Sequence, residues 1–211
     1  MFSLTKGFRH DSIDEGIKAL KNLGLTNNFE INATEDVSAF DESNLKKYAL
    51  VVFLNPTGSD LFNDEQKNAL KKYINNGGGF VGIHAATDCN YEWEWYGKMV
   101  GGYFASHPKI QTAKLDVVMP KHKIVKGLPN PWMHKDEWYN FNSFNKAVNV
   151  LVKVDETSYS GGKMNNDHPI SWYHEYDGGK VFYTALGHTK ECYTDPNFLM
   201  HLLAGIKWAM K

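Results

Sequence analysis

One stretch constrains the fold of this chain more than any other: residues 71–88, which read KKYINNGGGFVGIHAATD. Its first residues are typical of the last turn of a helix, which Asn75-Asn76-Gly77 would end. Phe80 to Ile83 is a short apolar run after glycines and predicts a buried strand. His84 would then lie in a sharp turn at the carboxyl edge of a sheet, where α/β enzymes expose catalytic side chains. A plain glycine loop followed by a core histidine explains this stretch, taken alone, equally well.

The segments before this stretch alternate between strand and helix patterns. Phe2 to Leu4 reads as the end of a first strand, and apolar residues then recur at helical spacing from Ile13 until Gly24, which would end the helix. Residues 29–33 alternate as an outer strand would, and residues 48–54 form a continuous apolar run typical of a strand covered on both faces. With a helix opening at Asn63-Asp64, this order predicts a parallel, doubly wound sheet.

The pattern beyond residue 88 is different and predicts an antiparallel extension of the sheet. Residues 170–176 and 180–185 flank Asp177-Gly178-Gly179, a strong hairpin signal. Residues 101–108 read as an irregular loop, residues 132–141 as a strand lining a pocket, and residues 148–154 as another strand. A last helix is expected from about Pro196 to Met210. With no linker or repeat, residues 1–211 are expected to form one domain.

Charge and hydropathy exclude some classes of partner. The net charge of -1 gives no electrostatic case for nucleic acid or for an anionic membrane. No apolar run approaches the ~20 residues needed to span a bilayer, and the start, MFSLTKGFRHDS, lacks the apolar core of a signal peptide. The sequence as written is therefore expected to be cytoplasmic. Because the first strand looks cut short, removal of an upstream export signal stays open.

Cys89 and Cys192 do not have a metal-binding spacing such as CxxC. Both follow expected strand ends, so a disulfide between them stays open, but two reduced thiols of a cytosolic protein are favoured. Nucleophilic catalysis finds no support, because there is no GxSxG motif and neither cysteine lies in the turn after residue 83. The glycines at 77–82 precede a strand, whereas those of a dinucleotide-binding motif follow one.

Four histidines fall where strand-end loops are expected: His10, His84, His107 and His188. Such loops converge on one crevice in an open α/β sheet. Histidine can act there as a base, a proton shuttle or a metal ligand, and Asp136-Glu137 would add carboxylates. No two histidines have a local spacing such as HxxxH, so the sequence supports a divalent metal only weakly and assigns no cofactor with certainty.

Aromatic residues are dense in two segments, and two interpretations of them stay open. The residues concerned are Tyr91, Trp93, Trp95, Tyr96, Tyr103, Trp138, Tyr139 and Phe141. Aromatic faces beside polar groups would suit a carbohydrate cleft. The alternative is a hydrophobic lid or a subunit interface of a homo-oligomer.

These motifs together resemble one family. FRHDS, GGGFVGIHAATD, YEWEWYGKMVGGYFASHP, DEWYNF and HPISWYHEYDGGKVFYTALGH are similar to the ThuA-like (trehalose-utilisation) family over almost the whole chain. The resemblance implies a flavodoxin-like, class I glutamine amidotransferase-like fold: a three-layer sandwich with a mostly parallel sheet and an antiparallel extension. True amidotransferases have a nucleophilic cysteine at the turn where this chain has His84, so glutamine hydrolysis is not carried over.

The family implies sugar metabolism, and the expected chemistry is acid/base or metal-assisted reaction of a keto-glycoside by an isomerase, lyase or hydrolase. The residues expected to be catalytic are His84, Glu137 and His188. Those expected to bind the sugar are His10, Asp88, Trp93, Trp95, Tyr96, His107 and Trp138. Those expected to hold a divalent metal are His10, His107 and His188. The alternative is a non-catalytic carbohydrate-binding or regulatory domain that uses the same cleft.

Overall fold

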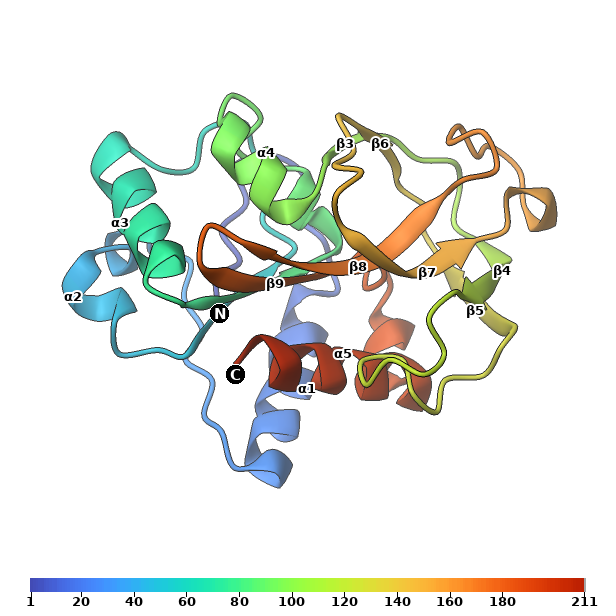
Figure 1. Cartoon of the computed structure of the whole chain (residues 1–211), viewed down its shortest axis with the longest axis horizontal. Coiled ribbons are helices and arrows are strands. Elements are labelled where there is room, and N and C mark those ends of the chain that lie inside the picture. Colours follow the sequence, from blue (N-terminus) through green and yellow to red (C-terminus); the bar gives the residue numbers. More distant parts are fainter. Residues whose placement is uncertain (211) are drawn as a thin grey trace.

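A mixed β-sheet runs through the centre of the protein in the computed structural model, which describes residues 1–210 (Figure 1). Within these residues the sheet has seven strands in the order β1-β2-β9-β8-β7-β4-β5. Three strands at one side are parallel: β1 (Leu50–Leu54), β2 (Gly79–Ile83) and β9 (Gly179–Thr184). The others continue the sheet in antiparallel pairs: β8 (Pro169–Tyr176), β7 (Asn149–Val154), β4 (Gln111–Val117) and β5 (Trp132–Asp136). The predicted α/β fold with a parallel core and an antiparallel extension is confirmed, but the sheet is mixed rather than mostly parallel, since two of its pairings are parallel and four are antiparallel.

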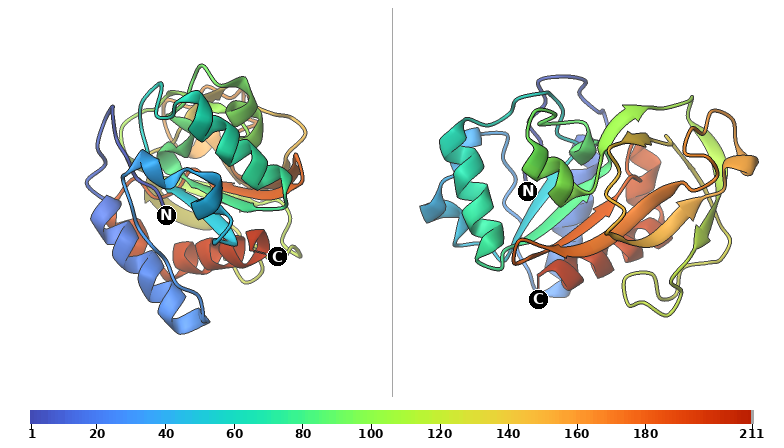
Figure 2. Two further views of the ribbon diagram at one scale, coloured as in Figure 1. Left: turned by 90° about the vertical axis from the view of Figure 1, so that its left-hand side faces the viewer. Right: turned by 45° about the horizontal axis from the view of Figure 1, so that its top comes forward.

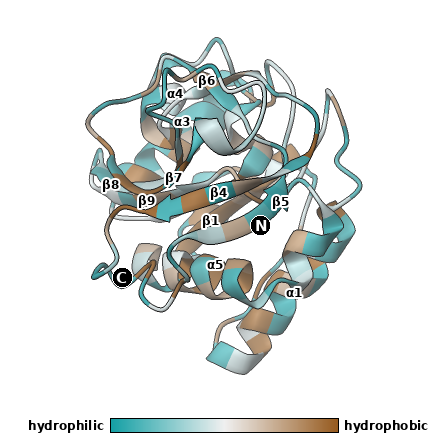
Figure 3. Ribbon diagram, turned by 90° about the vertical axis from the view of Figure 1, so that its right-hand side faces the viewer, coloured by the Kyte–Doolittle hydropathy of each residue, from teal (hydrophilic) through white to brown (hydrophobic). Residues whose placement is uncertain are grey.

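Helices cover both faces of this sheet, as Figure 2 and Figure 3 show. One layer holds α3 (Asp64–Asn75) and α4 (Glu94–Val100), and the opposite layer holds α1 (Ile13–Asn27) and α5 (Pro196–Ala209). The short helix α2 (Glu42–Leu45) lies beside α3. None of the helices in residues 1–210 is both long and apolar enough to cross a membrane.

The amino-terminal segment adds to the parallel side of the sheet only through isolated bridges. Phe2 bridges to Phe53 of β1 and to Thr34, both in parallel. The outer strand predicted for residues 29–33 is not a regular strand, but the end of this segment does pair with the first residues of the chain: the Met1 amine donates to the Asn32 carbonyl oxygen at 2.7 Å, and the Thr34 amide donates to the Met1 carbonyl oxygen at 2.9 Å. The Phe29 amide instead donates to the Gly24 carbonyl oxygen at 3.2 Å, which holds the returning chain against α1.

Gly24 does not end the first helix, as the sequence suggested. It lies inside α1, which continues to Asn27 and is followed by Asn28 in the left-handed conformation, with φ of 62°. A Cβ at Gly24 would lie 2.5 Å from the carbonyl oxygen of Phe29. Glycine is therefore needed for close approach of the return segment rather than for termination of the helix.

Two predicted segments in the second half of the chain are divided differently. The expected irregular loop at 101–108 contains β3 (Tyr103–Ser106), which pairs with β6 (Asn140–Asn142) in a separate two-stranded sheet. The strand expected over 132–141 is split, because β5 ends at Asp136 and the chain leaves the main sheet before β6. This departure places Glu137 at the carboxyl end of the parallel strands. The predicted hairpin of β8 and β9 is confirmed, with Asp177 and Gly178 at positive φ.

Candidate active site

His84 immediately follows β2 and has a left-handed backbone, with φ of 46°. The Tyr183 hydroxyl of β9 donates to the His84 carbonyl oxygen at 2.7 Å and helps to hold this turn. The ring Nδ1 lies 2.7 Å from the Ala185 carbonyl oxygen, which can only accept, so Nδ1 carries a proton. In the neutral ring, the lone pair is therefore on Nε2.

Glu137 is the carboxylate around which the histidines gather. It is buried, with 6% exposed surface, where the chain leaves β5. Its Oε2 lies 3.1 Å from His188 Nδ1 and 3.5 Å from His84 Nε2. Its Oε1 lies 2.8 Å from His107 Nδ1. Three histidines from distant parts of the chain thus contact one side chain.

His10 completes the group from the loop before α1. Its ring is 3% exposed and its centroid lies 4.9 Å from that of His84 and 5.0 Å from that of His188. Its Nδ1 is buried without a hydrogen-bond partner among the described residues. A buried polar atom without a partner is costly, so its presence here points to a ligand.

Electrostatics separate the protonation states of this group. Burial alone would raise the pKa of Glu137, but its hydrogen bond with His188 and its contact with His84 outweigh burial and lower that pKa to about 2. Burial lowers the pKa of His188, but its contacts with Glu137 outweigh burial and raise the pKa overall. Burial, followed by the charges of His84 and His188, lowers the pKa of His10 to about 2. At neutral pH the group therefore contains an ionised carboxylate and a neutral His10.

The donor atoms of His10, His84, Glu137 and His188 all lie within 4.8 Å of one another. Three imidazoles and one carboxylate suit zinc or another divalent transition metal, and the unpartnered His10 Nδ1 supports the fit. The expected metal set named His107 in place of His84 and Glu137. In the structure, His107 lies outside this donor group, because it contacts the other oxygen of Glu137 and its side chain is 44% exposed.

Asp136, the neighbour of Glu137, holds the loop that carries His188. Its carboxylate accepts hydrogen bonds from the Gly187 amide at 2.8 Å and from the Thr189 amide at 3.2 Å. Ser12, which precedes α1, donates to the Gly187 carbonyl oxygen at 3.2 Å instead of capping its own helix. The sequence interpretation missed both supports, although Asp136 was recognised as a carboxylate of interest.

Asp88 lies near this group but makes its own pair, because it accepts a hydrogen bond from the Tyr91 hydroxyl. Burial raises the pKa of Asp88, and the hydrogen bond from Tyr91 only partly offsets this effect. The charges of His84, Glu137 and His107 also influence its pKa. Asp88 is therefore close enough for its protonation to respond to the histidine group.

The aromatic residues expected to bind sugar do not gather around the histidines. Tyr96 and Trp138 are fully buried and donate to the backbone oxygens of Ala86 and Gln111, so they offer no face to a ligand. Their assignment as sugar-binding residues is corrected to core positions. Trp93 and Trp95 stack on each other, and Trp95 Nε1 donates to Asp177 at the tip of the β8–β9 hairpin. That tip lies at the opposite end of β9 from the site, roughly 15 Å away for a strand of this length.

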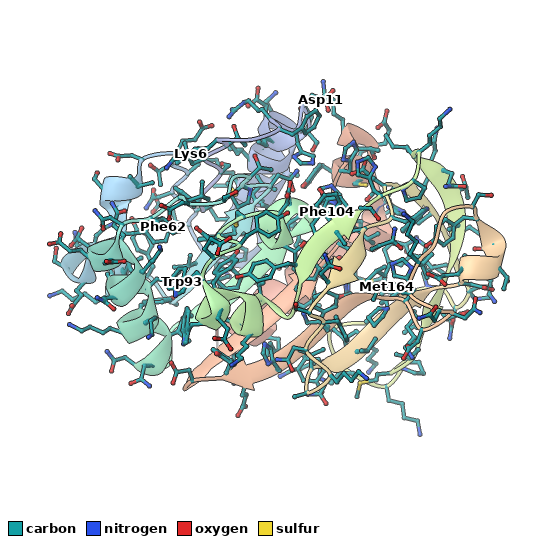
Figure 4. All side chains as sticks on the ribbon, turned by 90° about the horizontal axis from the view of Figure 1, so that it is seen from above. Lys6, Asp11, Phe62, Trp93, Phe104 and Met164 are labelled. Atoms are coloured by element: carbon teal, nitrogen blue, oxygen red, sulfur yellow. The ribbon has the colours of Figure 1, made fainter. Side chains whose placement is uncertain are left out.

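Other aromatic rings flank the histidines. Tyr139 lies against the His84 ring with 4.1 Å between centroids, and Phe104 packs on Tyr139 at 4.3 Å. Phe8 packs edge-on against His10 at 5.0 Å and is 66% exposed. Figure 4 shows Phe104 and Trp93 on different parts of the molecule, with Trp93 beside α4. Phe8 is the most exposed of these rings, and Phe104 is partly exposed.

A cavity of about 650 Å³ lies elsewhere, between α2 and α3, and its lining includes Glu42, Lys72 and Gly77. It contains no histidine and lies toward the amino end of β2. Ligands of open α/β sheets usually bind at the carboxyl ends of the strands, and perturbed ionisable groups there are candidates for a functional site. The histidine group is therefore the better candidate.

The comparisons with known proteins agree with one another. A family model described as ThuA, trehalose utilisation, matches residues 1–209. A putative ThuA-like protein from Bacteroides uniformis has a TM-score of 0.82 and 25% identity, with 99% of this chain and 89% of that chain covered. One from Parabacteroides merdae has a TM-score of 0.79 and 23% identity, with 100% and 89% covered. A cytoplasmic protein from Salmonella typhimurium has a TM-score of 0.67 and 14% identity, with 91% and 86% covered. No protein with a curated description matches in sequence.

Proposed function

The chain belongs to the ThuA family of trehalose utilisation, and from this membership we propose that it catalyses acid/base or metal-assisted chemistry on a keto-glycoside. The observation that carries the proposal is the convergence of His84, His107 and His188 on the buried carboxylate of Glu137. Such a convergence of ionisable side chains at the carboxyl edge of a sheet is typical of a catalytic site. The sugar is the proposed partner, bound in the cytoplasm.

A keto group makes the neighbouring C–H bond acidic, so a modest base can remove that proton. Glu137, with its low pKa, is a weak base and serves better to orient His107 and His188. His84 presents the lone pair of Nε2 and is the proposed base. His188, whose pKa is raised, is the proposed donor to the carbonyl oxygen.

A divalent metal held by His10, His84, Glu137 and His188 would supply a Lewis acid that polarises the substrate carbonyl. His107 lies outside that donor set and keeps its contact with Glu137 Oε1, so it would move the proton in this case. The two versions of the proposal therefore differ in the residue that acts as base. Removal of metal with a chelator separates them.

We also propose the finer fold assignment, a class I glutamine amidotransferase-like, flavodoxin-like sandwich without amidotransferase activity. The sharp turn at His84 after β2 supports the fold, and the histidine at that position argues against the nucleophilic chemistry. The nearby Cys89 is a poor substitute, because burial raises the pKa of its thiol to about 12.

The proposal is tested by incubating the purified protein with 3-keto-trehalose in D2O, with and without chelator, and following the products by NMR. We expect turnover with deuterium incorporated next to the carbonyl. Glu137→Gln is expected to lower the rate by at least about 100-fold, because the histidines lose their orienting charge. Glu175→Gln, on the exposed face of β8, is the matched control and should leave the rate unchanged.

Absence of turnover by the wild-type protein would contradict catalysis. In that case, sugar binding by calorimetry that survives Glu137→Gln would favour the alternative, a carbohydrate-binding or regulatory domain. The exposed Phe8 ring beside His10 is the feature that supports this alternative, since aromatic faces stack on sugars. Phe8→Ala would then abolish binding.

A further inference from the structure

Within residues 1–210, a second group of metal-ligating side chains lies behind the loop that carries His188. His134 and Asp136 point to the same side of β5, because alternate residues of a strand share a face. Cys192 comes from the 3₁₀ turn at Lys190–Thr194. The exposed fractions of the three residues are 7%, 0% and 1%, so all three are buried.

The distances between their donor atoms match those around one ion. Cys192 Sγ lies 3.4 Å from His134 Nε2 and 3.2 Å from Asp136 Oδ2. His134 Nε2 lies 3.9 Å from Asp136 Oδ2. In tetrahedral zinc sites, metal–sulfur and metal–nitrogen bonds of about 2.3 Å and about 2.0 Å place ligand atoms roughly 3.3–3.5 Å apart. The side chains thus need little movement to hold a metal.

A further contact is typical of zinc-bound histidines. His134 Nδ1 lies 3.1 Å from Asp195 Oδ2, so this carboxylate can fix the ring with Nε2 directed at Cys192 and Asp136. Metal-ligating histidines usually donate their other ring N–H to such a carboxylate, which also fixes the tautomer. Asp195 itself caps α5, where its side chain accepts from the Asn197 amide, and is therefore held in place.

From this geometry we propose that His134, Asp136 and Cys192 bind a divalent transition metal of the zinc class, at a centre distinct from the histidine group around Glu137. A thiolate and a carboxylate would neutralise the ion, which permits its burial. On binding, the Cys192 thiol releases one proton to solvent, the metal–sulfur bond forms, and His134 stays neutral with Nδ1–H donating to Asp195. The Thr189 hydroxyl, 3.2 Å from Cys192 Sγ, can donate a hydrogen bond to the bound thiolate.

The proposed role of this ion is structural. Asp136 already binds the amides of Gly187 and Thr189, on either side of His188. An ion that joins Asp136 to Cys192 would tie both ends of the loop to β5. The ion would therefore fix the position of His188 without contact with a substrate.

Cobalt(II) tests the proposal, because a thiolate bound to cobalt gives a near-ultraviolet charge-transfer band that histidine and carboxylate ligands do not give. The metal-stripped full-length protein is titrated with Co²⁺, and we expect this band to saturate by two equivalents, because the histidine group around Glu137 can also bind cobalt. The band should be lost in Cys192→Ser and in His134→Gln. It should remain in Cys89→Ser, the matched control, because Cys89 contacts Tyr96 and Ala86 instead of metal ligands.

Glu137→Gln separates this centre from the proposed catalytic site, because it should keep the thiolate band while catalysis is lost. Circular dichroism is used to check that each variant is folded. If Cys192→Ser does not fold, His134→Gln provides the second test. The proposal is overturned if the wild-type protein gives no thiolate band. It is also overturned if the band persists in Cys192→Ser, or if the band is lost in Cys89→Ser.

Discussion

At the scale of single residues, the backbone of His84 is a distinctive feature of the candidate site. An L-residue in the left-handed region costs roughly 1 kcal/mol or more, and the cost is usually tolerated where the geometry serves a function. Here the turn directs Nδ1 to the Ala185 carbonyl oxygen and Nε2 toward Glu137. An ordinary helical or extended φ would direct the ring elsewhere, so the strain and the position of Nε2 are linked.

This strain predicts an inverted order of stability for two substitutions. Both His84→Gly and His84→Ala remove the ring, but only glycine relieves the positive φ. We expect the glycine variant to be more stable than the alanine variant by about 1 kcal/mol in urea unfolding.

Ala85→Gly is the control, because Ala85 follows in the same turn without a positive φ. At position 85 alanine is expected to be the more stable residue, so Ala85→Gly should destabilise the protein. An alanine variant at position 84 that equals or exceeds the glycine variant in stability would show that the turn is not strained.

The sequence located most of the histidine group, and for a physical reason. His10, His84 and His188 follow or precede recognisable strand ends, so topology alone brings them to one edge. The sequence-based assignment of the aromatic residues as sugar-binding was wrong for Trp138 and Tyr96, because an aromatic residue reads the same in the sequence whether it faces a ligand or the core. Their burial depends on what packs over them, which neighbours in sequence do not reveal.

At the scale of elements, the end of β5 gives the adjacent carboxylates of Asp136 and Glu137 different surroundings. Its burial alternates, with Trp132, His134 and Asp136 inside and Met133 exposed. This period of two was readable in the sequence and could have revealed His134 as a partner of Asp136. The end of β5 was not readable, because it depends on pairing of β6 with β3. Glu137 therefore leaves the sheet while Asp136 stays in it.

The end of α4 gives a prediction about packing between elements. Gly101 has φ of 103° and a Cβ there would lie 2.2 Å from Trp172 Nε1 of β8, which donates to the Val100 carbonyl oxygen. Gly101→Ala is therefore expected to destabilise the protein by about 2–4 kcal/mol, from backbone strain and the clash together. Thermal and urea unfolding measure the loss.

Gly102→Ala is the matched control one residue further along. A Cβ at Gly102 would meet its nearest neighbours at 3.5 Å, which is ordinary contact. Its effect should stay below about 1 kcal/mol. Equal losses at the two positions would mean that the contact with Trp172 is not what requires glycine at position 101.

At the scale of the whole molecule, the two halves of the sheet differed in how far the sequence predicted them. The parallel pair of β1 and β2 follows from strand–helix alternation, since the crossover through α3 returns the chain in the same direction. The antiparallel half places β4 between β7 and β5, an order that no local pattern encodes. The only strand pairing predicted in that half was the β8–β9 hairpin, because its turn is local.

Buried histidines predict how stability depends on pH. His201 of α5 is fully buried against Ser171 and Ile124, and burial lowers its pKa to about 4. Between the unfolded pKa of about 6.5 and this value, the unfolded chain binds a proton that the native state excludes. Stability is therefore lost as the pH falls, by about 2 kcal/mol from this residue between about pH 7.5 and about pH 5.

His201→Gln should flatten the pH dependence of the free energy of unfolding by that amount, whatever its effect at neutral pH. His122→Gln serves as control, because His122 is only partly buried and stacks on Tyr173 at the surface. The prediction fails if His201→Gln and the wild-type protein lose stability in parallel over this pH range.

The bond from Ser12 to the Gly187 carbonyl oxygen joins groups that are 175 residues apart. At synthesis rates of about 5–20 residues per second, Gly187 is synthesised roughly 10–35 seconds after Ser12. Strand β9, which joins the parallel strands to the antiparallel ones, is equally late in the sequence. In a nascent chain, His10 and His84 therefore lack His188 as a neighbour until the segment around residue 188 has been synthesised.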